Sequence, residues 1–284
     1  MFQGKSRSQT QVAISNSAGS GGSDSWFLLN ASPDLRMQIE RSGALCPRST
    51  GRNSPIGGVL LTSADIDQIA GLLSLRELQP FRIYCTPSLR RILQEDNSIF
   101  AMLNRVANQV VWTEIACSGS FSLCSTAGTD SGICCATFSL GRRYPAYVSP
   151  KRAVELKPEE ALLGVTLSSS SAGRVAYLPA VPAIDNSLIQ RLAAVNLVLF
   201  DGTFWSDDEL IRVQGSGATA REMGHVPVSG PGGSLRKLAG LHGPRKVFVH
   251  VNNTNPMLDE SSPEYSEVRA AGWEVAEDGW HFDL

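Results

Sequence analysis

The chain has 284 residues, of which 42% are hydrophobic and 18% charged, and its formal net charge is −2 at pH 7. This composition is typical of a globular protein with a sizeable core, and the small charge excludes a general affinity for nucleic acid or anionic lipid. No run of about 18 apolar residues is present to span a membrane, and the start, MFQGKSRSQTQ, lacks the apolar core of a signal peptide. We therefore expect a cytoplasmic protein.

Short apolar runs bounded by Gly, Pro, Ser and Asn predict strands along the whole chain. The predicted strands are Gln11–Ser15, Trp26–Asn30, Val59–Thr62, Arg82–Cys85, Val110–Thr113, Cys134–Leu140, Leu162–Ser168, Arg174–Leu178, Leu197–Phe200, Lys246–Val251, Trp273–Ala276 and Trp280–Phe282.

Longer periodic segments between these strands predict helices. They are Ile66–Leu78, Ser88–Leu93, Ile99–Val106, Ile184–Ala194, Ser234–Leu241 and Pro263–Ala271. We find neither an internal repeat nor a linker, so we expect one domain over residues 1–284. The distribution of strands predicts two sheets packed face to face, with helices outside.

Three segments rich in small residues predict loops. Ala18–Ser23 and Ala127–Gly132 are short turns, whereas Gln214–Gly233 is a long glycine-rich loop. A loop of this length inside a compact domain usually has a function.

The six cysteines contain no C-x-x-C pair. The vicinal Cys134 and Cys135 lie in the segment ICCATFSL, which has the pattern of a buried strand. We interpret the cysteines as reduced apolar thiols rather than as metal ligands.

Two of the four histidines lie where ligand chemistry is expected. His250 ends a predicted strand before an Asn-rich loop, a position at which α/β folds bind ligands, and His225 lies in the glycine-rich loop. His242, in a polar turn, and His281, near the carboxyl end, are interpreted as surface or structural residues.

Acidic side chains follow two further predicted strands. Asp65 and Asp67 lie between a strand and a helix, and either cap that helix or bind a metal. Asp201, in Phe200-Asp-Gly-Thr-Phe-Trp205, either forms an Asp-Gly turn or joins the site. Three strand ends thus offer Asp67, Asp201 and His250, the glycine-rich loop adds His225, and together they predict one convergent rim.

The segment 62–71, TSADIDQIAG, resembles the metal-binding turn T-H-x-H-x-D-H-x-x-G of the metallo-β-lactamase superfamily. Five further segments resemble the coenzyme PQQ (pyrroloquinoline quinone) synthesis protein B family, and the similarity runs from about residue 6 to the end. These segments are NASPDLR (30–36), GLLSLRE (71–77), FDGTFW (200–205), REMGH (221–225) and HVNNTNPMLDE (250–260).

The resemblance implies an α/β fold, the four-layer αββα sandwich of the metallo-β-lactamases. It implies a role in PQQ biosynthesis as a metal-dependent oxygenase, which hydroxylates the tyrosine-derived ring of a Glu–Tyr precursor made from a peptide. The alternative is a non-catalytic carrier or transport factor for PQQ or its precursor. Hydrolysis by a metal-bound hydroxide is a third hypothesis, and a homodimer is left open.

The resemblance also implies a ligand set. Asp67, His225 and His250 would hold iron in a site of two histidines and one carboxylate, with Asp201 beside it. Arg221, Asn252 and Asn253 are the candidate substrate-binding residues.

Departures from the superfamily pattern weaken this prediction. Ser63 and Asp65 replace its first two histidines, and Gln68, a poor ligand for iron or zinc, replaces the histidine after the aspartate. Zinc is considered too, but the family's amino-terminal C-x-C-x-x-C zinc motif does not precede Ser6. Two alternatives follow: a start codon assigned too late, or a shortened paralogue that lacks the first sheet strand.

Overall fold

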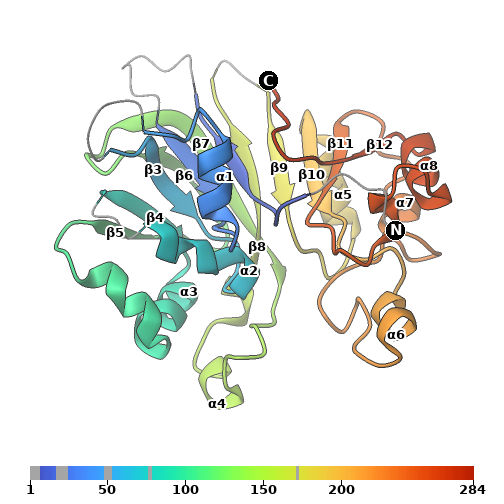
Figure 1. The fold of residues 1–284 in the computed structure, drawn as a ribbon, viewed down its shortest axis with the longest axis horizontal. Helices are drawn as coiled ribbons and strands as arrows, with labels where there is room; N and C mark the ends of the chain where they lie inside the picture. The colour runs from blue at the N-terminus through green and yellow to red at the C-terminus, as the bar shows by residue number, and fades with distance from the viewer. Residues whose placement is uncertain (1–6, 17–24, 48–52, 76–78, 171–172) are drawn as a thin grey trace. The chain divides into compact units, whose positions relative to one another are not determined.

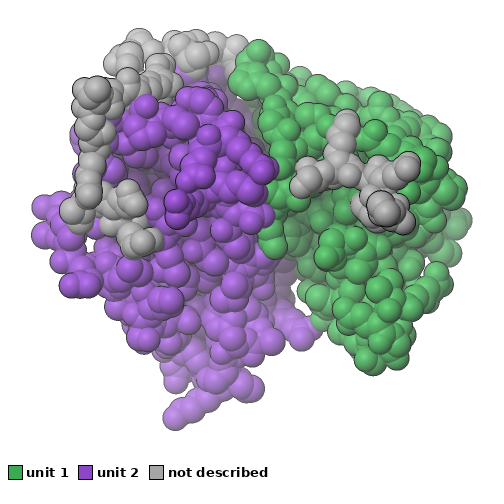
Figure 2. Space-filling model, viewed as in Figure 1, with its two compact units in different colours: residues 1–10, 172–284 green, residues 11–171 purple. Residues whose placement is uncertain are grey.

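The computed structural model describes residues 7–16, 25–47, 53–75, 79–170 and 173–284. The chain forms two compact units (Figure 2). We call residues 11–171 the N-terminal unit, and residues 1–10 with 172–284 the C-terminal unit. No helix of the described residues has the length and hydropathy that crossing a membrane requires. This division into two units does not test the expectation of one domain over residues 1–284, which stays a prediction.

The N-terminal unit contains a five-stranded sheet in the order β1-β2-β3-β4-β5. Its strands are β1 (Val12–Ile14), β2 (Trp26–Leu29), β3 (Ile56–Leu60), β4 (Phe81–Cys85) and β5 (Val110–Glu114). β1 is antiparallel to β2, and the other neighbours are parallel. Parallel neighbours need a crossover segment, and helices such as α1 (Leu35–Arg41), α2 (Ile66–Ile69) and α3 (Pro87–Arg91) lie between them along the chain (Figure 1).

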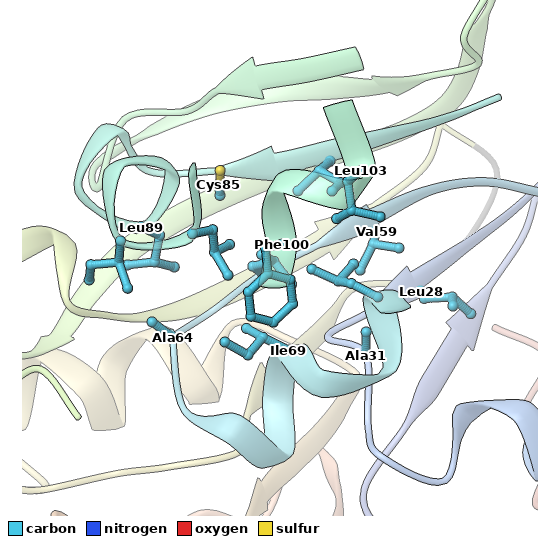
Figure 3. Close-up of a cluster of buried hydrophobic side chains, with 14 of the residues drawn as sticks. Leu28, Ala31, Val59, Ala64, Ile69, Cys85, Leu89, Phe100 and Leu103 are labelled. Atoms are coloured by element: carbon cyan, nitrogen blue, oxygen red, sulfur yellow. The ribbon is translucent and has the colours of Figure 1, made fainter. Parts of the chain in front are cut away.

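The helical crossovers bury an apolar cluster against this sheet (Figure 3). Leu28 and Val59 come from neighbouring strands, Ile69 from α2, and Phe100 from a 3₁₀ segment, Ser98–Asn104. All four side chains are buried, and burying a side chain of this size contributes about 1.5–3 kcal/mol. This cluster holds α2, which carries Asp67, against the sheet.

Three antiparallel strands complete the N-terminal unit: β6 (Gly119–Cys124), β7 (Asp130–Gly141) and β8 (Leu162–Ser168). β6 was not predicted, because its glycine and serines dilute the apolar alternation. Helix α4 (Pro150–Ala153) lies between β7 and β8 along the chain. The hydroxyl of Tyr84 links β4 to β6, since it donates to the carbonyl oxygen of Cys124 at 3.0 Å.

The C-terminal unit contains four parallel strands in the order β12-β11-β10-β9. They are β9 (Val175–Leu178), β10 (Leu197–Asp201), β11 (Arg245–Val249) and β12 (Trp273–Val275). The helices are α5 (Asn186–Ala193), α6 (Glu209–Gln214), α7 (Ser234–Lys237) and α8 (Pro263–Ala270), and α8 packs beside β12 (Figure 1).

Side-chain caps define where two of these helices begin. Asp185 accepts from the main-chain N–H of Leu188 at 2.8 Å, and Ser262 accepts from that of Tyr265 at 2.9 Å. Such caps satisfy main-chain donors that the first helical turn leaves without a partner. Parallel pairing then brings the carboxyl ends of β10 and β11 to one edge, with Asp201 in register with Val249.

The structure corrects several predicted elements. Residues 280–282 form no strand; instead, the rings of Trp280 and Phe282 lie against the guanidinium of Arg245, with centroids at 5.9 and 4.5 Å. The predicted helix Ile66–Leu78 is α2 followed by a 3₁₀ segment, Ala70–Leu75, with residues 76–78 outside the described part.

Other differences concern short helices and loops. The segment predicted as the helix Ile99–Val106 is largely 3₁₀, and α1, α4 and α6 were not predicted. The predicted turn Ala18–Ser23 lies outside the described residues.

Candidate metal centre

Three potential metal ligands come together in the C-terminal unit. Asp201 ends β10, His250 follows β11, and His225 lies in the glycine-rich loop after α6. One ligand atom from each lies within 4.8 Å of the others. Among the described residues, this is the group of histidine, cysteine and acidic side chains whose spacing fits a metal ion.

Asp201 is fully buried, and main-chain donors hold both of its carboxylate oxygens. The N–H of Val181 donates to Oδ2 at 2.8 Å, and the N–H of Thr203 donates to Oδ1 at 3.0 Å. Burial by itself raises the pKa of Asp201, but the neighbouring His225 and His250 and the hydrogen bonds outweigh it and leave the pKa below its ordinary value. The surroundings of this buried carboxylate therefore favour its charged form.

His225 lies against this carboxylate, with Nδ1 2.8 Å from Oδ2 of Asp201. The ring of His225 stacks on the ring of His250, with 5.5 Å between the ring centroids, and makes an edge-on contact with Phe204 at a centroid distance of 5.8 Å. The loop holds the residue in place, because the N–H of His225 donates to the carbonyl oxygen of Ala220 at 2.9 Å. The ring is thus held by electrostatic, aromatic and main-chain contacts.

His250 occupies an unusual backbone conformation at the end of β11, with φ of 53°. A positive φ is uncommon for a residue other than glycine, and surrounding hydrogen bonds stabilise it here. The hydroxyl of Thr203 lies 2.7 Å from Nδ1 and 3.0 Å from the carbonyl oxygen of His250. Buried Asn255 donates to the carbonyl oxygen of Gly202 at 2.9 Å, which joins the loops after β10 and β11.

The donor set fits a borderline transition metal. Two imidazoles and one carboxylate are ligands for zinc and for ferrous iron. The carboxylate that the structure places beside the two histidines is Asp201, whereas the sequence assigned that position to Asp67.

Asp67 lies on α2 of the N-terminal unit, where its Oδ2 accepts a hydrogen bond from Nε2 of Gln68 at 2.8 Å. Gln68 itself is buried, and its Oε1 accepts from the side chain of Asn30. The assignment of Asp67 as a metal ligand stays a prediction.

The candidate substrate-binding residues lie in the two loops of the C-terminal unit. Arg221 is exposed, and its guanidinium donates to the carbonyl oxygen of Gly232 at 3.2 Å. Asn252 donates to the hydroxyl of Thr254 at 2.8 Å, while Asn253 is exposed. Their role in substrate binding stays a prediction.

Two residues of the cluster were missed by the sequence analysis. Thr203 lies two positions after Asp201, and Asn255 precedes Pro256 and caps a short 3₁₀ turn through its side chain. The only signal for Thr203 was a hydroxyl close to a strand-end aspartate, a pattern that also occurs in ordinary turns.

His242 and His281 are exposed, which agrees with their interpretation as surface residues. The expected burial of the cysteine pair is only half right: Cys135 is buried on β7, which raises the pKa of its thiol, whereas Cys134 beside it is exposed. A buried thiol in its neutral form is inert.

Residues 25–251 match the family of beta-lactamase superfamily domains. Coenzyme PQQ synthesis protein B of Xanthomonas oryzae pv. oryzae is 39% identical over 279 residues, which covers 98% of this chain and 88% of the relative. The protein of the same name from Gluconacetobacter diazotrophicus is 39% identical over 277 residues, 96% of this chain and 87% of the relative.

Solved structures lead to the same family. The crystal structure of zinc-bound PqqB from Methylobacterium extorquens superposes with a TM-score of 0.86 at 36% identity and covers 99% of this chain and 89% of that one. A diphosphatase of the PhnP family, at 16% identity and a TM-score of 0.59, shares the fold alone. The metallo-β-lactamase fold predicted from the sequence is thereby confirmed, and the chain belongs to the coenzyme PQQ synthesis protein B family of the beta-lactamase superfamily.

Proposed function

We propose that this protein of PQQ synthesis is a metal-dependent oxygenase that hydroxylates the tyrosine-derived ring of the Glu–Tyr precursor. The observation that carries the proposal is the buried carboxylate of Asp201, which lies 2.8 Å from Nδ1 of His225, beside the stacked rings of His225 and His250. A cluster of this composition has the ligand types of mononuclear iron oxygenases.

Each residue of the cluster has a separate task in this proposal. His225 and His250 hold the metal, and Asp201 either joins them as a ligand or orients His225 through the 2.8 Å hydrogen bond. Bound iron would supply the oxygen-dependent oxidation. Arg221 would pair with the precursor's carboxylates, and Asn252 and Asn253 would donate hydrogen bonds to its polar groups.

The identity of the metal is part of the proposal. The relative from Methylobacterium extorquens binds zinc, and the donor set of this chain accepts zinc as well as iron. Zinc has no redox chemistry, so a hydroxylation requires iron in its place. A protein that carries only zinc supports the second candidate function.

The second candidate is a carrier that binds the precursor or PQQ without changing it. Gln68 favours this candidate, because it stands where the superfamily has a histidine and its amide is bonded to Asn30 and Asp67. A site with one fewer imidazole binds metal less tightly. The carrier would keep the same substrate-binding residues and lose only the oxidation.

The deciding experiment combines metal content with turnover. Protein purified without oxygen is loaded with ferrous iron, freed of excess metal, and compared with His250→Ala, Asp201→Ala, Asp67→Ala and the distant His242→Ala. For an oxygenase we expect near-stoichiometric iron in the wild type and His242→Ala, and loss of iron in His250→Ala.

The same samples are then mixed with the cross-linked Glu–Tyr precursor under ¹⁸O₂ and a two-electron reductant such as ascorbate, because one oxygen atom enters the ring and the other is reduced to water. An oxygenase yields a product that contains ¹⁸O. An enzyme that takes the new oxygen atom from water yields an unlabelled product, and this result contradicts the proposal. Stoichiometric binding of unchanged precursor by folded protein identifies the carrier.

A further inference from the structure

Thr203 lies at the centre of the metal cluster, and its hydroxyl oxygen is close to every member. Oγ1 is 2.6 Å from Oδ1 of Asp201, 2.7 Å from Nδ1 of His250 and 3.1 Å from Nδ1 of His225. It also lies 3.0 Å from the carbonyl oxygen of His250. Because a threonine hydroxyl carries one hydrogen, it donates in only one of these directions at a time.

The carboxylate of Asp201 determines the direction of that hydrogen. Each oxygen of Asp201 already accepts from a main-chain N–H, so both oxygens act as acceptors in this cluster. Two oxygens 2.6 Å apart require a hydrogen between them. The hydroxyl of Thr203 therefore donates to Asp201 and presents only lone pairs to the histidines.

This direction fixes which ring nitrogen of each histidine carries the hydrogen. Nδ1 of His250 faces a lone pair of the Thr203 hydroxyl, and Nδ1 of His225 faces a lone pair of the same hydroxyl and also Oδ2 of Asp201. Because these partners are acceptors, each Nδ1 must carry the hydrogen and donate it. A neutral imidazole has one N–H, and a lone pair then remains on Nε2 of both rings. That lone pair is what binds a metal ion.

We propose that Thr203 is a positioning residue that sets His250 in the Nδ1–H tautomer, as Asp201 sets His225, so that both rings present Nε2 as the ligand atom. The hydrogen-bonded partner of a histidine ligand fixes its tautomer and raises its basicity. The purpose of this arrangement rests on the proposed metal site, but the tautomers are a property of the metal-free protein.

The test compares Thr203→Val, which keeps the shape and removes the hydroxyl, with Thr203→Ser, which keeps the hydroxyl. Thr219→Val is the matched control, because the hydroxyl of Thr219 accepts from the loop N–H of Glu222 at 3.2 Å and is no member of the metal cluster. The tautomers are read from the ¹⁵N shifts of the imidazole nitrogens in metal-free protein, about two pH units above the ordinary histidine pKa of ~6.5. His225→Gln and His250→Gln assign the signals.

We expect the hydrogen on Nδ1 of both rings in the wild type, Thr203→Ser and Thr219→Val. In Thr203→Val the ring of His250 should shift toward the Nε2–H form while His225 keeps Nδ1–H. Competition with a chelator should show that Thr203→Val binds zinc or iron about 10- to 100-fold more weakly, as for other partners of metal-bound histidines, and that Thr203→Ser restores the affinity.

Two results would overturn the proposal: the Nε2–H form of His250 in the wild type, or unchanged tautomer and metal affinity in folded Thr203→Val. If Thr203→Val does not fold, the wild-type spectrum still overturns the proposal when His250 carries its hydrogen on Nε2. If the tautomers are as expected but the wild type retains no metal, the proposed function fails and the positioning role of Thr203 stands.

Discussion

Gln68 turns its amide nitrogen, and not its oxygen, toward Asp67. The orientation follows from the main chain, because the N–H of Thr62 donates to Oδ1 of Asn30 at 2.8 Å. The amide nitrogen of Asn30 must then face Oε1 of Gln68, which leaves Nε2 to donate to Asp67 at 2.8 Å. In this arrangement Gln68 is a hydrogen-bond donor to an acid, and its oxygen is already in use.

Replacement of Gln68 by Glu should therefore destabilise the fold. A carboxylate cannot donate to Asp67, and it places a second negative charge beside it. We expect the free energy of unfolding at pH 7 to fall by about 1–3 kcal/mol, the cost of an unpaired buried polar group. Urea denaturation measures the loss, with the exposed Gln214→Glu as control. Equal losses in the two variants would contradict the orientation.

Tyr84 should make the N-terminal unit sensitive to alkali. Burial raises the pKa of its phenol to about 12, although the hydrogen bond to Cys124 acts in the opposite direction. Since the ordinary pKa is about 10, folding favours the neutral phenol, and its contribution to stability is lost as the pH rises from about 10 through 12. Tyr84→Phe removes this titration.

The expected result is a shallower fall of unfolding free energy above pH 10 in Tyr84→Phe than in the wild type. At neutral pH the variant should lose about 1 kcal/mol, because the carbonyl oxygen and N–H of Cys124 each lose a hydrogen bond to the phenol. Guanidinium denaturation across this pH range checks both statements, and parallel curves for the two proteins would refute the first.

Glu274 should contribute stability that is lost in acid. Its two oxygens accept from Arg245 at 2.6 and 2.9 Å, and this hydrogen bonding outweighs partial burial and lowers the pKa of Glu274. A lowered folded-state pKa stabilises the protein above the ordinary value of about 4.3, and the effect disappears as the pH falls through the folded-state pKa.

Glu274→Gln should lower the unfolding free energy at pH 7 by less than about 1 kcal/mol, because Arg245 is half exposed and the pair is screened. The difference from the wild type should vanish at acid pH and shrink in about 1 M salt. A loss that is independent of both pH and salt would assign the effect to packing.

Gly71 is required by a close approach of two main-chain segments. A Cβ at this position would lie 2.1 Å from the carbonyl oxygen of Ser32, whereas one at Gly43 would meet nothing within 4 Å. Gly71→Ala should therefore cost about 1–3 kcal/mol or more by overpacking, and Gly43→Ala should be close to neutral. Thermal unfolding of both variants compares them directly, and similar melting temperatures would be inconsistent with the close approach.

Substrate binding should depend on Arg221 without any effect on the metal. A charged hydrogen bond contributes about 1.5–3 kcal/mol, so Arg221→Ala should weaken binding of the precursor about tenfold or more. Exposed Lys237 on α7 offers Lys237→Ala as the control. Calorimetric titration with the precursor measures the affinity, and metal analysis of the same samples measures the metal content. An unchanged affinity of Arg221→Ala for the precursor would mean that Arg221 is a surface residue without a role in binding.

Most strands were predictable from sequence because each is a short run of buried apolar residues. The strand Leu197–Phe200 was placed within one residue of β10, and Arg82–Cys85 within one residue of β4. The segment after Ile66 was less predictable, because Gly71 packs against the main chain of Ala31 and Ser32 and the helix tightens there into a 3₁₀ segment. That contact joins residues far apart in sequence, which a local pattern does not contain.

The same reason separates the predicted from the unpredicted parts of the site. Asp201 ends β10 and His250 follows β11, and parallel strands bring such positions together. The contribution of Thr203 depends on a hydroxyl that meets three side chains from different segments, at distances set by the folded backbone.

The parallel pairing of β10 and β11 has a consequence for how the protein can be checked after refolding. Asp201 lies opposite Val249, one residue before His250. Misalignment of these strands by one position would turn the side chain of His250 to the opposite face of the sheet. The number of metal ions bound per chain at the proposed site would therefore measure the fraction of correctly aligned molecules. Misaligned molecules would be compact and have the same content of secondary structure, but they would not bind the metal.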